Sequence, residues 1–369
     1  MFVLALSLYN TWNRGVFLLC KITNLLIYSL LLVFGLTVYG VFRGEDLESM
    51  MHSIRQAQWQ WLVPGVALVL FFIWSESIII WYMMKSYGTR LKKRSCFLFS
   101  SVGFFFSCIT PSASGGQPMQ IYYMKKEKIP IPVSTVVLMI VTITYKLVLV
   151  VIGIGILIFG QGFLHRYLEG VLQVYYLGLG LNVFCVVFMT VLVFHPVLTK
   201  EILKKGVHLL EKLRLMKHKE ERLEKLDASM DTYRGTAVYL KEHMGVIVVV
   251  FGITFVQRMA LFAATWFVYR AFGLSGTSFF DILFLQAVIA VAVDMLPLPG
   301  GMGISETLFL NIFRPVFGSL LLPGMVLSRG LGYYAELLIS AAFTVVAQLT
   351  IGNEKVREQK KCIEERVEG

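Results

Sequence analysis

Apolar runs about as long as a lipid bilayer is thick alternate with short polar segments along the chain. Because a transmembrane helix needs about 20 consecutive apolar residues, six runs are predicted to be full membrane spans: residues 23–42, 61–84, 133–160, 171–194, 246–268 and 321–350. Two further apolar stretches, residues 95–124 and 279–313, are each interrupted by prolines and glycines, so their arms are too short to cross comfortably. We therefore predict an all-helical polytopic membrane protein with six full spans and two re-entrant hairpins, or eight crossings if the hairpins span.

The two interruptions have a similar composition. Residues 110–118 read TPSASGGQP and residues 296–306 read LPLPGGMGISE, so each places proline before a Gly-Gly pair and a helix-forming run after it. Non-helical backbone at membrane depth is tolerated only where protein buries it or a watery cavity wets it. We therefore expect both turns to approach one shared cavity near the midplane, with helix N-termini directed inward. Pro118 suits a first helical turn, and Ser305 with Glu306 suits a helix N-terminus by capping and by charge.

Basic residues flank the apolar runs and predict which side each loop occupies. The loop from Lys85 to Arg94 contains five basic residues and no acidic one, Lys125, Lys126 and Lys128 follow the first hairpin, and the tail is basic. We therefore expect both termini in the cytoplasm, the first hairpin entering from the cytoplasm and the second from outside. Each half then reads span, span, hairpin, span, in inverted orientation, which is a transporter architecture.

This pattern divides the chain into four parts. They are a first membrane half (1–198, with its hairpin at 95–124), a cytoplasmic basic linker (199–245), the rest of the second membrane half (246–350, whose first span is 171–194) and a cytoplasmic tail (351–369). Within the linker, apolar residues recur every seven positions from Ile202 to Met230. This spacing predicts one amphipathic helix over residues 200–228 at the membrane surface. A coiled coil is the competing interpretation.

Composition and charge support this class. The chain is 57% hydrophobic and only 15% charged, with a formal net charge of +11. Such a charge in a soluble protein would suggest nucleic acid, but no recognition motif accompanies it, so anionic membrane phospholipids are the expected partners and nucleic acid is not. No HExxH, CxxC or GxxxxGK[ST] sequence occurs, and we predict no metal site, no cofactor and no direct use of ATP.

Ionisable residues inside apolar runs are the second signal for a site. A charge within the bilayer costs about 2.5–3.5 kcal/mol on an insertion scale, so each should face the interior and have a partner. Three are cations, namely Lys146, Arg258 and Arg329, and four are acids, namely Glu76, Asp294, Glu306 and Glu336. The acids are expected to pair with the cations, contact a cationic headgroup or relay protons, and a structural ion pair between Glu76 and Arg258 is one alternative. The glycine pairs Gly153/Gly155 and Gly178/Gly180 are expected to allow close helix packing.

Free N–H groups at helix N-termini, together with the three cations, indicate an anionic ligand such as a lipid phosphate. The expected headgroup-binding residues are Ser112, Ser114, Gly115, Gly116, Gln117, Lys146, Arg258, Gly300, Gly301, Ser305 and Arg329.

The segment from Thr110 to Lys126 and the later Pro299–Glu306 resemble the lysylphosphatidylglycerol synthase transmembrane-region family, the flippase half of the bacterial multiple peptide resistance factor. The likeness covers roughly residues 20–350. It implies an inner-membrane protein that moves or binds anionic or lysyl-modified phospholipids, and that in some members helps resist cationic antimicrobial peptides. Full-length members carry a soluble domain that attaches lysine to phosphatidylglycerol. Since this chain ends at Gly369, we expect a stand-alone member without that enzymatic activity.

The leading hypothesis from the sequence is therefore a phospholipid flippase. A membrane-embedded enzyme acting on lipid headgroups is an alternative, which would need a nucleophile or base near Ser112 or Ser114. A third is a regulatory partner of other envelope proteins that acts through the basic helix predicted at residues 200–228.

Overall fold

The computed structural model describes residues 47–160, 162, 167, 170–212 and 220–351. The first predicted span, residues 23–42, and the predicted tail, residues 352–369, lie outside the described residues. In the described part the chain is helical, apart from turns and one isolated β-bridge.

Five helical segments are long and apolar enough to cross a membrane. They are α4 (Trp59–Ser86), α7 (Ile131–Phe159), α9 (Leu172–Phe194), α12 (Met244–Ala271) and the composite segment Arg314–Thr350. Each corresponds to a predicted span, with ends that differ by a few residues. At about 1.5 Å per residue, a helix of 28 residues such as α12 is about 42 Å long, enough for the apolar core and both interfaces.

The composite segment is interrupted along its length. It consists of α15 (Arg314–Phe317), the 3₁₀ turn η1 (Gly318–Leu320), α16 (Leu321–Arg329), the π-helix η2 (Gly330–Ala335) and α17 (Glu336–Thr350). A π-helical turn widens the helix locally and is frequent at functional sites. Here the π-helix begins directly after Arg329 and ends directly before Glu336, two of the ionisable residues that the sequence places in this span.

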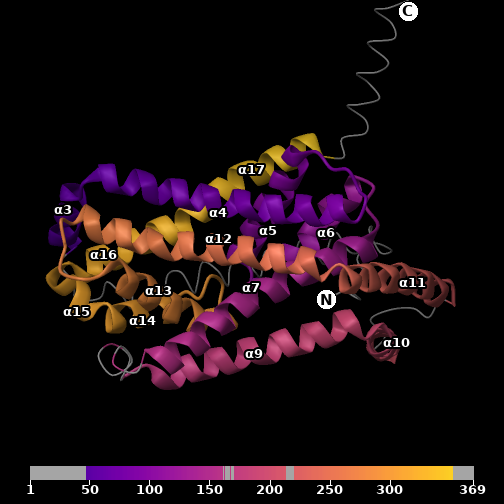
Figure 1. Ribbon diagram of the computed structural model, residues 1–369. Coiled ribbons are helices and arrows are strands. Elements are labelled where there is room, and N and C mark those ends of the chain that lie inside the picture. The colour runs from indigo at the N-terminus through magenta and orange to yellow at the C-terminus, as the bar shows by residue number, and fades with distance from the viewer. Residues whose placement is uncertain (1–46, 161, 163–166, 168–169, 213–219, 352–369) are drawn as a thin grey trace, which may run out of the picture.

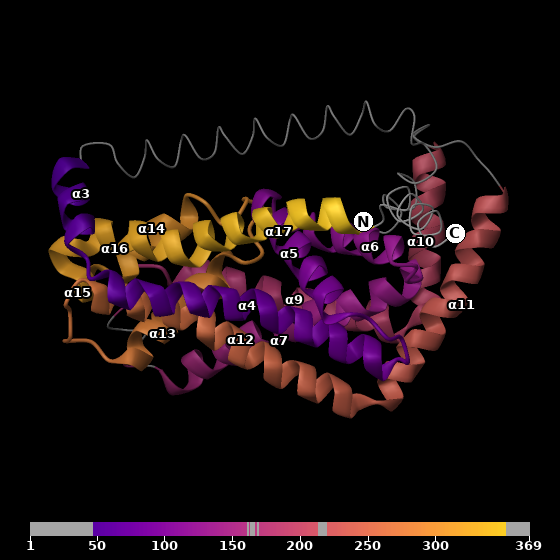
Figure 2. The same cartoon turned by 90° about the horizontal axis from the view of Figure 1, so that it is seen from above.

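Four shorter helices form two pairs, each with a glycine-rich turn at its tip. The first pair is α5 (Lys93–Ile109) with α6 (Gly116–Lys126), and the second is α13 (Phe279–Val293) with α14 (Ile304–Ile312). In Figures 1 and 2, the first pair lies toward the end of the molecule that carries α10 and α11, and the second lies toward the end that carries α3 and α15. The two turns therefore approach the middle of the molecule from opposite ends.

Close approach of the helix backbones depends on particular glycines. A Cβ added at Gly178 of α9 would lie 2.5 Å from the Val291 carbonyl oxygen of α13, and one at Gly116 of α6 would lie 2.7 Å from the Gly103 carbonyl oxygen of α5. A Cβ at Gly153 would meet Leu179, whereas Gly155 and Gly180 face open space. In each predicted glycine pair, one member therefore allows close packing and the other does not.

The hydrophilic linker differs from its prediction. The described residues of the range 200–228 belong to two helices, α10 (Pro196–Lys212) and α11 (Glu220–Glu242), instead of one. Ion pairs between them join Lys200 and Lys204 to Asp227, at 3.1 and 3.2 Å. Ile202 is exposed while Met230 is buried, so the seven-residue repeat does not line one continuous face. The chain folds into a helical hairpin because α11 buries its own apolar side, including Tyr233 and Leu240, against the spans.

One short helix was not predicted. Residues 47–56, within the polar connection expected at 43–60, form α3 (Leu47–Gln56), which contacts α16.

Candidate functional site

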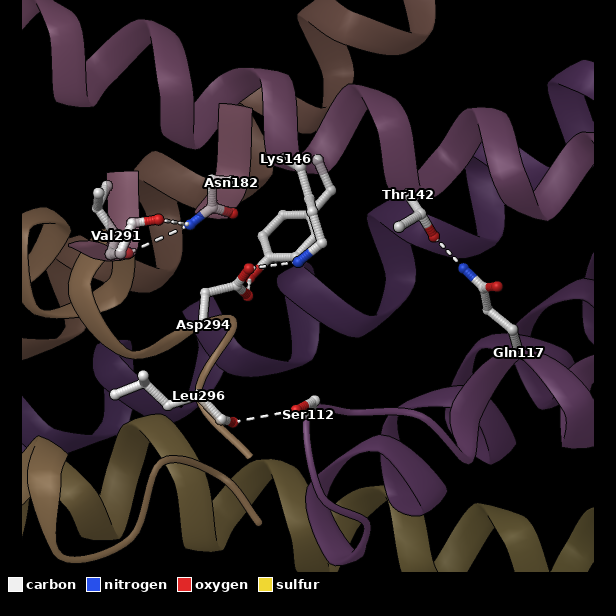
Figure 3. A network of polar contacts seen from close by, with 10 residues as sticks. Ser112, Gln117, Thr142, Lys146, Asn182, Val291, Asp294 and Leu296 are labelled. Carbon is white, nitrogen blue, oxygen red and sulfur yellow. Dashed lines mark hydrogen bonds and ion pairs between the residues drawn. The ribbon is translucent and has the colours of Figure 1, made fainter. Parts of the chain in front are cut away.

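The two glycine-rich turns touch each other. Pro111 and Pro299 form an isolated antiparallel β-bridge, and the Ser112 hydroxyl donates a hydrogen bond of 3.2 Å to the Leu296 carbonyl oxygen (Figure 3). Two segments from opposite halves of the chain thus meet at a backbone contact. The predicted meeting of the turns at one place is present in the structure.

Both turns contain backbone in the left-handed region. Ser112 and Ala113 have φ values of 49° and 53°, and Gly300 and Gly301 have values of 56° and 66°. Only glycine adopts this region without penalty, so the two non-glycine residues hold local strain of the kind that clusters at ligand sites. A Cβ at Gly300 would also lie 2.1 Å from the Tyr333 ring. The second turn thus needs glycine for its conformation and for its contact with η2.

A cavity of about 460 Å³ opens beside the two turns. This volume is within the usual range for small-molecule sites. Of the predicted site residues, Gly115, Gly116 and Glu306 lie outside the lining. The others all line it: Ser112, Ser114, Gln117, Lys146, Arg258, Gly300, Gly301, Ser305, Arg329, Glu76, Asp294 and Glu336.

Lys146 is held in an ion pair at the side of the cavity. It is buried within α7, and its ammonium group donates to the carboxylate of Asp294, the first residue after α13 (Figure 3). The neighbouring Tyr145 hydroxyl donates to the same carboxylate. The pair thus neutralises a charge that would be costly alone in an apolar interior, and it attaches the second turn to α7.

Arg329 holds the other end of the second turn. Its Nε donates to Glu306 at 2.7 Å and its Nη2 donates to the Gly300 carbonyl oxygen at 3.0 Å. The same Glu306 accepts from the Gly303 backbone N–H at 2.7 Å. Gly303 is therefore the N-cap of α14, and the expectation that Ser305 caps this helix is wrong, because Ser305 lies inside its first turn. The carboxylate of Glu306, as expected, occupies the positive end of the helix dipole.

Arg258 has a different environment from the other two cations. Its guanidinium group lies 3.6 Å from the centre of the Tyr145 ring and 4.7 Å from that of Phe72. Its Nε is buried without a hydrogen-bond acceptor, and across the described part of the chain no carboxylate forms an ion pair with it. The suggested pair with Glu76 is thus absent. Stacking on aromatic faces stabilises a cation by about 0.5–2 kcal/mol while leaving its N–H edge available to an anion.

The two remaining acids have neutral partners. Glu76 accepts a hydrogen bond of 2.9 Å from the Gln120 side-chain amide. Glu336 lies 3.7 Å from the Cys108 sulfur, which donates to it. The adjacent Tyr333 hydroxyl donates to the Cys108 carbonyl oxygen at 3.0 Å, near the C-terminal end of α5.

Sequence reasoning missed several polar residues of the cavity. Gln120, Tyr145 and Tyr333 all contact the predicted residues, and Gln257, Thr265, Gln286 and Ser328 also line the space. A glutamine inside an apolar run is a usable signal, since an unpaired amide in lipid is costly. The tyrosines carried no such signal, because aromatic residues are common throughout this chain.

The comparisons with known proteins identify the family. No curated protein matches this chain. The family model of the lysylphosphatidylglycerol synthase TM region matches residues 22–340, which include both glycine-rich turns, every charged residue of the cavity and most of the helical segments. Since the match extends over most of the sequence, and the five apolar helices agree with a multi-pass membrane protein, this chain belongs to the lysylphosphatidylglycerol synthase TM region family.

Proposed function

We propose that this protein is a phospholipid transporter that binds the anionic part of a lipid headgroup in the cavity between the two turns. The observation that carries the proposal is the position of Arg258, an arginine without a carboxylate partner in the described structure, on the wall of that cavity. Lysylphosphatidylglycerol synthase is a lipid enzyme by name, and a lipid headgroup is the anion that a multi-pass protein meets most often.

In this proposal the phosphate lies against Arg258, whose planar fork matches phosphate oxygens. Ser112 and Ser114 are exposed at the turn, and the side chain of Gln117 offers an amide. Ser114 offers a hydroxyl donor, whereas Ser112 would donate to the ligand only after releasing its hydrogen bond to Leu296. Gly115 and Gly116 lie outside the lining and would act indirectly, because they let the start of α6 pack closely against the end of α5. Lys146 and Arg329 act mainly through their ion pairs, which hold Gly300, Gly301 and Ser305 in place.

We further propose that α5–α6 and α13–α14 are re-entrant hairpins in a bacterial cytoplasmic membrane, with both termini in the cytoplasm. The arms support this: α5 has 17 residues and α13 has 15, shorter than the roughly 20 residues that a span needs. The cavity then lies near the midplane, and rocking of the inverted halves exposes it to each side in turn. Redistribution of anionic lipid would also contribute to resistance against cationic peptides.

The proposal is tested by lipid translocation in phosphatidylcholine proteoliposomes that contain a trace of fluorescent phosphatidylglycerol. Arg258→Gln removes the charge and keeps a polar side chain. We expect it to slow translocation by about tenfold to a hundredfold, because hydrogen bonds to charged groups contribute about 1.5–3 kcal/mol. The readout is the fraction of label reached by an impermeant quencher over time.

Arg270→Gln is a matched control. Arg270 lies on the same helix, stacks on Trp61 and Trp266, and is absent from the cavity lining. The Arg270→Gln variant should translocate lipid at the same rate as the unmodified protein. Equal translocation rates for Arg258→Gln, Arg270→Gln and the unmodified protein would show that Arg258 is not part of the binding site. The absence of translocation by the unmodified protein would reject transport itself.

A further inference from the structure

The ionisable groups in and directly behind the lining of the cavity include more acids than cations even before an anion binds. Its lining contains three cations, Lys146, Arg258 and Arg329, and three acids, Glu76, Asp294 and Glu336. Asp294 is paired with Lys146, and Arg329 is paired with Glu306 just behind the lining. Among the described residues of the lining, Arg258 is then the remaining cation, and Glu76 and Glu336 are the two remaining acids. A bound phosphate would offset the charge of Arg258 and increase this excess of negative charge.

The hydrogen bonds of these two acids are compatible with a protonated form. Glu76 is bonded to the neutral amide of Gln120 and Glu336 to the thiol of Cys108, and among the described residues neither has a cation within ion-pair distance. Only 8% of Glu336 is exposed. An ionised carboxylate in such surroundings is much more costly than a neutral one, so a change in the local charge decides which form is present.

We propose that Glu76 and Glu336 form a proton-binding pair that couples the binding of an anionic phosphate group at Arg258 to the uptake of a proton. The inference rests on the transport function proposed above. A phosphate bound at Arg258 neutralises the positive charge that stabilises the two carboxylates, and it places a further negative charge beside them. One carboxyl group then takes a proton from water. Because such coupling is reciprocal, protonation of the pair also strengthens the binding of the anion.

The groups that face this pair come from several helices. Arg258 of α12 and Arg329 of α16 line the same cavity as both carboxyl groups. The others are Cys108 on α5, Tyr145 and Lys146 on α7, Asp294 after α13, and Tyr333 on η2. Charged residues at the ends of the same helices stack elsewhere: Lys85 and Lys93 on Trp81, and Arg270 on Trp61. Arg258 is thus the cation whose charge affects both the binding of the ligand and the binding of the proton.

The experiment uses the full chain in phosphatidylcholine vesicles with a pH-sensitive dye inside. Fluorescent short-chain phosphatidylglycerol or inorganic phosphate is added outside. We expect the lipid to acidify the lumen, and its apparent affinity to rise about tenfold for each unit by which the outside pH is lowered, the slope for one coupled proton. The variant carrying Glu76→Gln and Glu336→Gln keeps the shape of both side chains and should lose both effects. Asp281→Asn, at the start of α13 and absent from the cavity lining, should keep them.

Each outcome separates the two proposals. Lipid movement without acidification, at an affinity independent of pH, overturns the coupling and leaves transport standing. Acidification driven by inorganic phosphate alone supports the proton-binding pair and rejects a lipid as the substrate. Neither lipid movement nor acidification rejects both proposals. Full coupling in the double variant overturns the assignment to these residues. The measurements on the unmodified protein decide the coupling even if a variant fails to fold.

Discussion

Gly300 lies where the backbone of the second turn passes closest to an aromatic ring. Its φ is positive, its carbonyl oxygen accepts from Arg329, and an added Cβ would meet the Tyr333 ring at 2.1 Å. Tyr333 in turn donates to the Cys108 carbonyl oxygen beside the first turn. One residue without a side chain thus permits a contact that connects the second turn, η2 and the end of α5.

Replacing Gly300 by alanine is expected to destabilise the fold. The left-handed conformation costs a non-glycine residue about 1–2 kcal/mol, and the clash with Tyr333 adds about 1–3 kcal/mol of overpacking. Gly273→Ala is the matched control, because Gly273 also has a positive φ but an added Cβ would meet nothing within 4 Å. Thermal unfolding in detergent should show the larger loss for Gly300→Ala. Equal losses would mean that the approach to Tyr333 has no energetic consequence.

The packing of α9 against α13 depends on a small residue and a polar one. Gly178 brings the two backbones together, and the buried side-chain amide of Asn182, one turn later, donates to the Gly178 carbonyl oxygen at 2.9 Å. The same amide donates to the Val291 carbonyl oxygen at 3.2 Å (Figure 3). Val291 lies three residues before Asp294. The position of α9 therefore helps to position the acid that pairs with Lys146.

We expect Gly178→Ala to destabilise this helix pair by about 1–3 kcal/mol, because the new methyl group would meet backbone atoms, which cannot rotate away as a side chain does. Gly180→Ala, at an open position two residues on, should be neutral or slightly stabilising, since alanine favours a helix by about 0.5–1 kcal/mol over glycine. Unfolding in mixed detergent micelles measures both. A Gly178→Ala variant as stable as Gly180→Ala would contradict the packing argument.

The whole molecule has two ends with different loops. Arg90 and Lys128 flank the first hairpin, and Ser275 and Ser319 flank the second. The helices α6 and α11 lie toward one end of the molecule, and α15 lies at the opposite end (Figures 1 and 2). All four side chains are exposed. If both hairpins are re-entrant, the first two residues lie in the cytoplasm and the last two lie outside.

Cysteine labelling in whole cells tests this topology. We expect an impermeant maleimide to label Ser275→Cys and Ser319→Cys in intact cells, and Arg90→Cys and Lys128→Cys only after the membrane is opened. The tip distinguishes a hairpin from two crossings: Ser114→Cys should react with a small reagent supplied from the cytoplasmic side. The parent protein, with its native cysteines, gives the background. Rapid labelling of the Ser114→Cys tip by the bulky impermeant reagent in intact cells would instead indicate that α5 and α6 span.

The positions of the spans and turns depend mostly on local sequence, so they can be predicted from the sequence alone. The length of an apolar run follows from bilayer thickness, so α4, α7, α9 and α12 begin and end near their predicted residues. Proline and glycine interrupt helices wherever they cluster, so both turns were predicted at 110–118 and 296–306. Seven-residue spacing in the linker was misleading, because whether a polar helix continues or folds back depends on partners such as Asp227, far along the chain from Lys200.

Which acid pairs with which cation, by contrast, was decided by the tertiary structure. The sequence determined that three cations and four acids lie within or beside apolar helices, since these residues occur within or next to the apolar runs. It could not determine that Asp294 joins Lys146, that Glu306 joins Arg329, or that Arg258 stacks on Tyr145 instead of meeting Glu76. Electrostatic attraction is strong in an apolar interior but acts over short distances and favours any available partner. Helix packing, through contacts such as Gly178 with Val291, brings particular pairs within reach and leaves Arg258 facing the cavity.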